Sequence, residues 1–242
     1  IAIRDTAIWL GMMIVSAGCA VTLWPSVWSV PFWLVYGVLY GSAADSRWHE
    51  CGHNTAFKTT WMNDAVYQLA SFMIMRNPAI WQASHVRHHT DTIIVGRDPE
   101  IVAMRPPDLA RIALAFVGVV DVYTAFKRMI LHASGRIDPE EATYVAAKDH
   151  AKVFRVARIW LVIYGCTIAA AVLMTSLLPL MLIGLPRLYG AWHHVLTGLL
   201  QHVGLAENVS DHRLNTRTVL MNPVSRFIYL NMNYHLEHHM FT

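Results

Sequence analysis

Histidine is the residue type whose number and spacing point most directly to chemistry. The chain of 242 residues holds 14 histidines, although 55% of it is hydrophobic. Eight of them fall in three short clusters: HECGH from residue 49, HVRHH from residue 85 and HLEHH from residue 235. Spacings of three and four residues put side chains on one face of a helix. One HxxHH pattern is expected by chance about 0.05 times in such a chain, so two copies indicate a function.

A metal centre explains why so many imidazoles would converge. Packed together without a metal, they would repel one another when protonated and waste hydrogen bonds when buried and neutral. Neutral imidazole is a common ligand of iron, copper and zinc, and a tetrahedral zinc takes four ligands. Eight or more ligands therefore indicate two metal ions, for which iron fits best and zinc is a plausible misloaded substitute. The predicted ligands are His49, His53, His85, His88, His89, His235, His238 and His239.

The composition indicates a membrane protein. Charged residues make up 14% of the chain, its mean hydropathy is +0.36 and its formal charge is +3. This excludes disordered tails, coiled coils and polar nucleic-acid modules, which need far more charge. Cys19, Cys51 and Cys166 form no CxxC pair and are expected to be small buried hydrophobic residues.

Four segments are read as membrane spans. Residues 6–24 and 27–44 are expected to form a helical hairpin around a turn rich in interfacial aromatic residues. Residues 156–178 give a third span and residues 183–201 a fourth, which carries a proline, an arginine and a histidine pair. The expected fold is an all-α, polytopic membrane bundle of about four transmembrane helices, with one domain over residues 1–242.

The remaining segments are expected to form a helical cap on one side of the membrane. Residues 65–75 are too short to cross it, and residues 110–130 carry charges such as Arg111, Asp121 and Lys127, so both are predicted to be interfacial helices. The cap consists of residues 45–155 and 203–242, which hold 13 and three of the 19 lysines and arginines. The positive-inside rule then puts the cap and its metal site in the cytoplasm.

The chain resembles the membrane fatty acid desaturase and hydroxylase superfamily. The clusters HECGH, HVRHH and NYHLEHH are similar to its three histidine boxes, and HHTDTIIVGRDPE and QHVGLAENVSDHRLNTRT resemble the sequences around them. The similarity extends over most of the chain from Asp45 and is weakest between Arg105 and Arg155. The resemblance implies a cytoplasmic di-iron centre (Fe2+/Fe3+) ligated almost entirely by histidine, with the eight box histidines as ligands.

The resemblance also implies one more histidine ligand before the third box. His202 is the preferred candidate, with His212 next and the pair at His193 and His194 last. His194 lies eight residues before His202, about 12 Å along a helix, which is too far to share the site easily.

Carboxylates close to the boxes could orient imidazoles through their second nitrogen, although solvated charges at the cap surface are an equal alternative. The candidates are Glu50, Asp91 and Glu237, whereas Asp98 and Glu100 are expected to pair with arginines. His132 and His150 have no partner at ligand spacing and are expected at the surface.

The favoured function is an O2-dependent membrane oxidoreductase that desaturates an acyl lipid. A hydroxylase or monooxygenase of the same superfamily, acting on a lipid, an alkane or a small polar substrate, is the first alternative. A remote alternative is a haem or metal-handling membrane protein without oxygen chemistry. It fits less well, because haem carriers place single histidines deep in the bilayer and transporters place their ligands near its midplane.

Electrons are expected from a separate partner. The chain has no cysteine spacing typical of a rubredoxin or ferredoxin and no GxGxxG motif. We expect an external donor of the ferredoxin, rubredoxin or cytochrome type with its reductase, besides membrane lipid and without any nucleic acid. The favoured location is a bacterial inner membrane.

Overall fold

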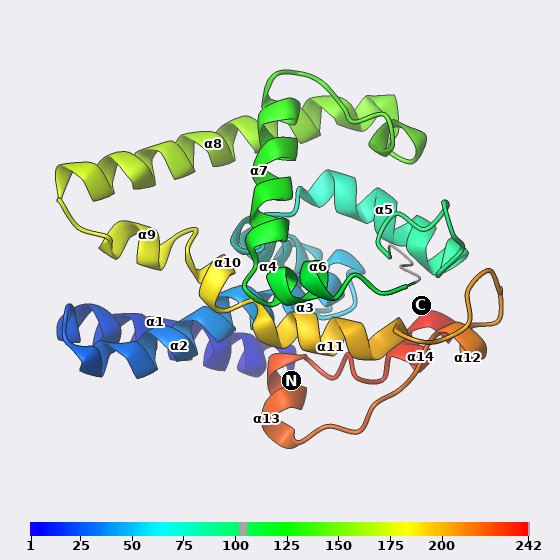
Figure 1. The fold of residues 1–242 in the computed structure, drawn as a ribbon, viewed down its shortest axis with the longest axis horizontal. Helices are drawn as coiled ribbons and strands as arrows, with labels where there is room; N and C mark the ends of the chain where they lie inside the picture. The colour runs from blue at the N-terminus through cyan, green and yellow to red at the C-terminus, as the bar shows by residue number, and fades with distance from the viewer. Residues whose placement is uncertain (102–105, 242) are drawn as a thin grey trace.

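The structure is a computed structural model that describes residues 1–101 and 106–241. Within these residues the regular elements are helices and there is no strand. Helix α1 (Ala2–Leu23) is followed, after a turn at Trp24–Ser26, by a second long helix over Val27–Gly52. This second helix is continuous through η1 (Val27–Ser29), α2 (Val30–Val38), the π-helical turn η2 (Leu39–Ala43) and α3 (Ala44–Gly52). The two lie side by side in Figure 1.

Within residues 1–101 and 106–241, three helices are long and apolar enough to cross a membrane: Ala2–Leu23, Val27–Gly52 and Ala147–Leu173. They overlap the first three expected spans. The second continues eight residues beyond its expected end and reaches the first histidine cluster. The third contains α8 (His150–Leu173), which begins before the expected residue 156 and ends before residue 178.

The expected fourth span, residues 183–201, is not one continuous helix. The chain forms α9 (Leu178–Leu182), α10 (Pro186–Tyr189) and α11 (Trp192–His202) instead. Gly184 has a φ of +95°, which a helix cannot contain, and Pro186 lacks a backbone donor. At 11 residues, α11 is about 17 Å long, shorter than a bilayer core of about 30 Å.

Both segments predicted to be interfacial are helical. Residues 65–75 lie largely in α4 (Thr60–Met73), and residues 110–130 are divided between α6 (Leu109–Phe116) and α7 (Val119–Ala133). These two helices bend by 80° at a short break, and counting them as one span would raise the number of candidates to four. Gly118 at the break has a φ of +68°, and a Cβ there would lie 2.2 Å from the carbonyl oxygen of Arg187.

The largest hydrophobic core joins the spanning hairpin to α4 and α5 (Pro78–Asp91). Trp9 donates from its Nε1 to the carbonyl of Leu39 at 2.8 Å and so fixes α1 against η2. Trp48 packs against Trp81 of α5, with ring centroids 3.8 Å apart. This packing fixes α3 and α5, which carry the first two histidine clusters, relative to each other.

Candidate metal centre

Helices α3, α5, α11 and the short α14 (His235–Met240) carry the clustered histidines. Helix α3 carries His49 and is capped by His53, while α11 ends at His202. Helix α5 carries the second cluster and α14 carries the third. Since spacings of three and four residues align on a helix, each element presents its imidazoles on one face.

The structure brings all nine predicted ligands into two groups. Within each group, one ligating nitrogen of each residue lies within 4.8 Å of those of all the others. In the closed group all four histidines are buried, whereas three members of the open group, His53, His89 and His238, are half-buried. The closed group consists of His88, His202, His235 and His239, and the open group of His49, His53, His85, His89 and His238.

The Nε2 atoms face one another at short distances. In the open group, the Nε2 of His85 lies 3.0 Å from that of His53 and 3.0 Å from that of His89. In the closed group, the Nε2 of His235 lies 3.1 Å from those of both His202 and His239. These separations match the distance of about 3.0 Å between two ligands at right angles whose bonds to one metal are about 2.1 Å long.

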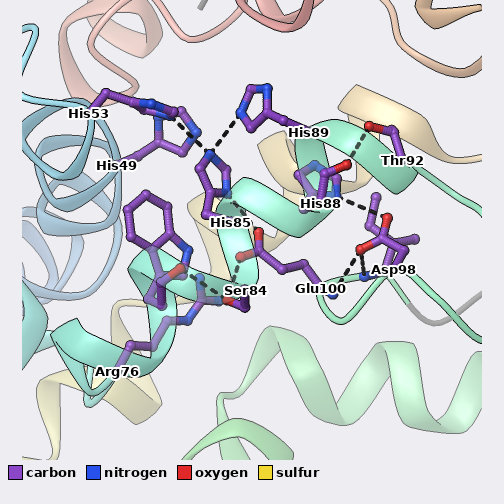
Figure 2. A network of polar contacts seen from close by, with 12 residues as sticks. His49, His53, Arg76, Ser84, His85, His88, His89, Thr92, Asp98 and Glu100 are labelled. Atoms are coloured by element: carbon purple, nitrogen blue, oxygen red, sulfur yellow. Dashed lines mark hydrogen bonds and ion pairs between the residues drawn. The ribbon is translucent and has the colours of Figure 1, made fainter. Parts of the chain in front are cut away.

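Acceptors behind the rings fix which nitrogen carries the proton. His85 donates from its Nδ1 to Glu100 at 2.9 Å, and His88 donates to Asp98 at 2.9 Å (Figure 2). His202 donates to the carbonyl of Asn215 at 2.9 Å. A neutral ring that donates from Nδ1 has its lone pair on Nε2, so these rings aim lone pairs into the groups.

This arrangement fits metal ions. Nitrogen lone pairs that face each other at about 3 Å repel, and a cation between them removes that repulsion. The buried Nε2 of His49 has no hydrogen-bond partner among the described residues, although its Nδ1 lies 3.2 Å from Glu50. A buried nitrogen without a hydrogen-bond partner is costly unless a metal ion or another ligand binds it. Imidazole suits iron, copper, nickel and zinc alike.

Burial keeps the imidazoles neutral. It lowers the pKa of His202 to about 4 and that of His238 to about 3, and it lowers that of His235 well below its usual value. Neighbouring imidazoles push the pKa values of His235 and His238 in the same direction. Burial also lowers the pKa of His88, but the hydrogen bond to Asp98 and nearby carboxylate charges outweigh it and raise the value overall. Neutral rings are the form that binds metal.

The carboxylates beside the rings differ from those expected. Of the three candidates, Glu50 lies beside His49, but Asp91 pairs with Arg97 at 2.8 Å and Glu237 accepts from Thr218. Asp98 and Glu100, which we expected to pair with arginines, accept from the imidazoles of α5 instead. The sequence showed two acidic residues shortly after the second cluster. It did not show that the chain turns back so that they contact α5, because that turn depends on the tertiary structure.

The candidates for an additional ligand separate clearly. His202 joins the closed group, whereas His194 accepts a contact from Arg187 at 3.4 Å and belongs to neither group. The ring of His212 lies 5.2 Å from that of His239, and His212 is also in neither group. His202 therefore stays the proposed additional ligand.

The expectation that His132 lies at the surface is wrong. This side chain is buried and contacts Glu141, with 2.7 Å between its Nε2 and a carboxylate oxygen. The carboxylate that pairs with this imidazole comes from the segment after α7, so the spacing of residues in the sequence did not predict the pair. His150 is half-buried, with its Nε2 3.4 Å from the carbonyl of Val145.

Trp81 supports the open group from behind. Its ring stacks on that of His85 with centroids 4.2 Å apart. Gly52 makes room for it, because a Cβ at Gly52 would lie 2.2 Å from the Trp81 ring. Trp81 thus fixes the plane of a predicted ligand.

A cavity of about 340 Å³ lies on the far side of Trp81, between α5, α7 and α8. Trp81, Ser84 and Glu100 line it, and Ser84 donates to Glu100 at 2.8 Å. The cavity therefore shares residues with the support of His85. Its other walls are both apolar and charged and include Ile80, Met129, Trp160, Arg76, Arg111 and Arg128.

Comparisons with known proteins agree with the site. A sequence model of a family described as fatty acid desaturase matches residues 3–242. The chain is 33% identical over 87 residues to an omega-6 fatty acid desaturase, endoplasmic reticulum isozyme 1, of Glycine max, covering 35% of this chain and 22% of that protein. It is 32% identical over 77 residues to a Delta(12)-acyl-lipid-desaturase of Punica granatum, covering 31% of this chain and 20% of that protein. The matched stretches thus span about a fifth of the length of these relatives.

Proposed function

Because the chain belongs to the fatty acid desaturase family, we propose that it oxidises C–H bonds of an acyl lipid with dioxygen and external electrons, introducing a double bond. The observation that carries this proposal is the pair of histidine groups, in which nine imidazoles aim nitrogens at two common centres. Iron is the proposed metal in both, because the family resemblance favours it and the ligand set accepts it.

The two hydrogen atoms removed from neighbouring carbons combine with dioxygen, two electrons and two protons to give two waters. The two metal ions, when bound, supply the activation of dioxygen that breaking an unactivated C–H bond requires. The protein's own part is to hold nine imidazoles, through acceptors such as Asp98 and Glu100, and to limit access of water. The half-buried members of the open group leave that side accessible to small molecules.

The cavity behind Trp81 suits an amphiphilic molecule. Apolar walls such as Met129 and Trp160 can cover part of a hydrocarbon chain, and the guanidinium groups of Arg111 and Arg128 can bind a polar head. Replacing Ala125, which lines the cavity, with leucine is expected to lower acyl-lipid turnover several-fold and leave the metal content unchanged. The matched control is Ala110→Leu, at an exposed alanine of α6 outside the lining.

The chain is a membrane protein, and we propose that α1, the helix over Val27–Gly52 and α8 are its spans. The proposed cap comprises residues 45–155 and 203–242 on the cytoplasmic side of a bacterial inner membrane. Both rest on the concentration of lysine and arginine in these two segments. The electron donor is proposed to be a separate protein of the ferredoxin, rubredoxin or cytochrome type.

Hydroxylation is the alternative outcome of the same hydrogen removal. One experiment separates the two: protein reconstituted in lipid with a donor and reductase is supplied with 18O2, and the lipids are analysed by mass spectrometry. An unlabelled double bond supports desaturation, and one 18O atom per product shows hydroxylation. No oxidised lipid from a preparation that holds about two irons contradicts the proposal. His88→Ala, which removes a predicted ligand, is the inactive control.

A further inference from the structure

Arg187 is a buried arginine outside both histidine groups. It lies on α10, between the second spanning helix, α7 and α11, and only 1% of its surface is exposed. A buried guanidinium is costly unless hydrogen bonds and charges compensate it. Its partners therefore indicate what the residue is for.

The first partner of Arg187 is the π-helical turn of the second spanning helix. Its Nη1 donates to the carbonyl of Gly41, within η2, at 2.8 Å. Single π turns interrupt the regular hydrogen-bond pattern of an α-helix and often occur at functional sites. Gly41 lies eight residues before His49 on the same continuous helix, so this bond fixes the part of the helix that leads to the open group.

The second partner is on α11. The same Nη1 lies 3.4 Å from the Nδ1 of His194, which is eight residues before His202. His202 is a member of the closed group. One guanidinium thus holds two helices, each about 12 Å, or two turns, before a predicted ligand, and the two ligands belong to different groups.

Further contacts close the junction around Arg187. Asp121 of α7 lies 3.4 Å from its Nη2 and supplies the opposite charge. Ser42 donates to the carbonyl of Gly190 at 2.7 Å and accepts from the backbone of His194 at 3.0 Å. A Cβ at Gly41 would lie 2.9 Å from the backbone of Gly190, so the two segments pack directly through their backbones.

We propose that Arg187 is a positioning residue that sets the relative placement of the two histidine groups by bonding η2 and α11 to each other. The inference rests on the proposed metal centre and adds to it a residue that touches neither metal nor substrate. Removing its contacts lets His49 and His202 shift relative to each other, and the affinity of each group for metal falls. The expected loss is about 10-fold to 100-fold, the range found for residues that orient metal ligands.

The test is a Co2+ titration of the metal-free, full-length protein in detergent, followed by visible absorption of the bound ion. Wild type is expected to bind about two Co2+ per chain. Arg187→Gln is expected to bind both ions at least about 10-fold more weakly, and Arg187→Lys, which keeps one donor for Gly41, is expected to recover part of the loss. The matched control is His132→Gln, which alters an equally buried polar contact of a residue that belongs to neither histidine group.

His194→Leu keeps the proposal falsifiable if Arg187→Gln does not fold. It removes the contact on α11 only, so one of the two binding steps is expected to weaken and the Co2+ spectrum of the other to stay as in wild type. Wild-type affinity in both His194→Leu and any folded Arg187→Gln overturns the proposal, as does an equal loss in His132→Gln. A wild-type protein that binds no Co2+ and no iron contradicts the metal centre itself, which is a different failure.

Discussion

The closed and open groups are made of the same residue type but are built differently. Every member of the closed group is buried, and each of its four rings has a partner at Nδ1: Asp98, Asn215, Thr92 or Gln201. In the open group only His49 and His85 are buried. The buried Nδ1 of His89 has no partner among the described residues.

The fold therefore fixes the ring orientations of the closed group, whereas several rings of the open group can adjust. Rings with bonded Nδ1 atoms are already oriented, so binding a metal there costs little further ordering. Rings without such bonds can adjust, and their partial exposure gives dioxygen and electrons an approach. We therefore expect the closed group to bind its metal more tightly and the open group to be the more reactive side.

Loss of a predicted ligand is expected to have the largest effect. His239→Ala and His89→Ala should each reduce lipid oxidation by more than the 10-fold to 100-fold typical of residues behind the ligands. Metal analysis should give about one ion per chain, since the other group stays intact. His150→Ala is the control, because this half-buried residue belongs to neither group. Full oxidation by either ligand variant would contradict both group assignments.

Removing a carboxylate behind a ring is expected to have the next largest effect. Asp98→Asn should weaken metal binding by about 10-fold to 100-fold, because His88 then loses a charged acceptor. Glu50→Gln should cost less, since its contact is longer, at 3.2 Å, and its side chain is more exposed. Asp91→Asn, which breaks a pair with Arg97, is the matched control and should bind metal as wild type does. Equilibrium metal titration ranks the three, and the reverse order would contradict the comparison.

Metal should leave the two groups at different rates. A hydrophilic chelator added to the loaded protein is expected to remove about one ion several-fold faster than the other, because ordered, buried ligands release a metal slowly. His53→Ala, on the exposed side of the open group, should abolish the fast phase and leave the slow one. Stopped-flow absorption measures both phases. Loss of both ions in one phase would show that the groups do not differ in this way.

The smallest effect is expected from crowding Trp81. A Cβ at Gly52 meets its ring at 2.2 Å, so Gly52→Ala must displace Trp81 or tilt His85. Overpacking of this kind costs about 1–3 kcal/mol, and a lower Tm of the solubilised protein should show it. Metal affinity should fall in the open group only. Gly165→Ala, where a Cβ would meet nothing within 4 Å, is the control and should not lower the Tm.

The three long candidate spans could be predicted well because local sequence decides them. The apolar runs that form α1, α2 and α8 predict spanning helices by their length and composition. The segment from Leu178 to His202 is also rich in apolar residues, but it forms three short helices. There the reason is partly local, at Gly184 and Pro186, and partly tertiary, where Gly190 packs against Gly37.

By itself, the sequence identified the clustered histidines as candidate metal ligands and predicted two ions, since imidazole chemistry and helical spacing are local properties. It could not determine how nine rings divide between two groups, because each group draws on helices far apart in the chain. It also missed the roles of Asp98, Glu100 and Arg187. Hydrogen bonds between remote segments depend on distance in space, and only the packing of the helices sets that distance.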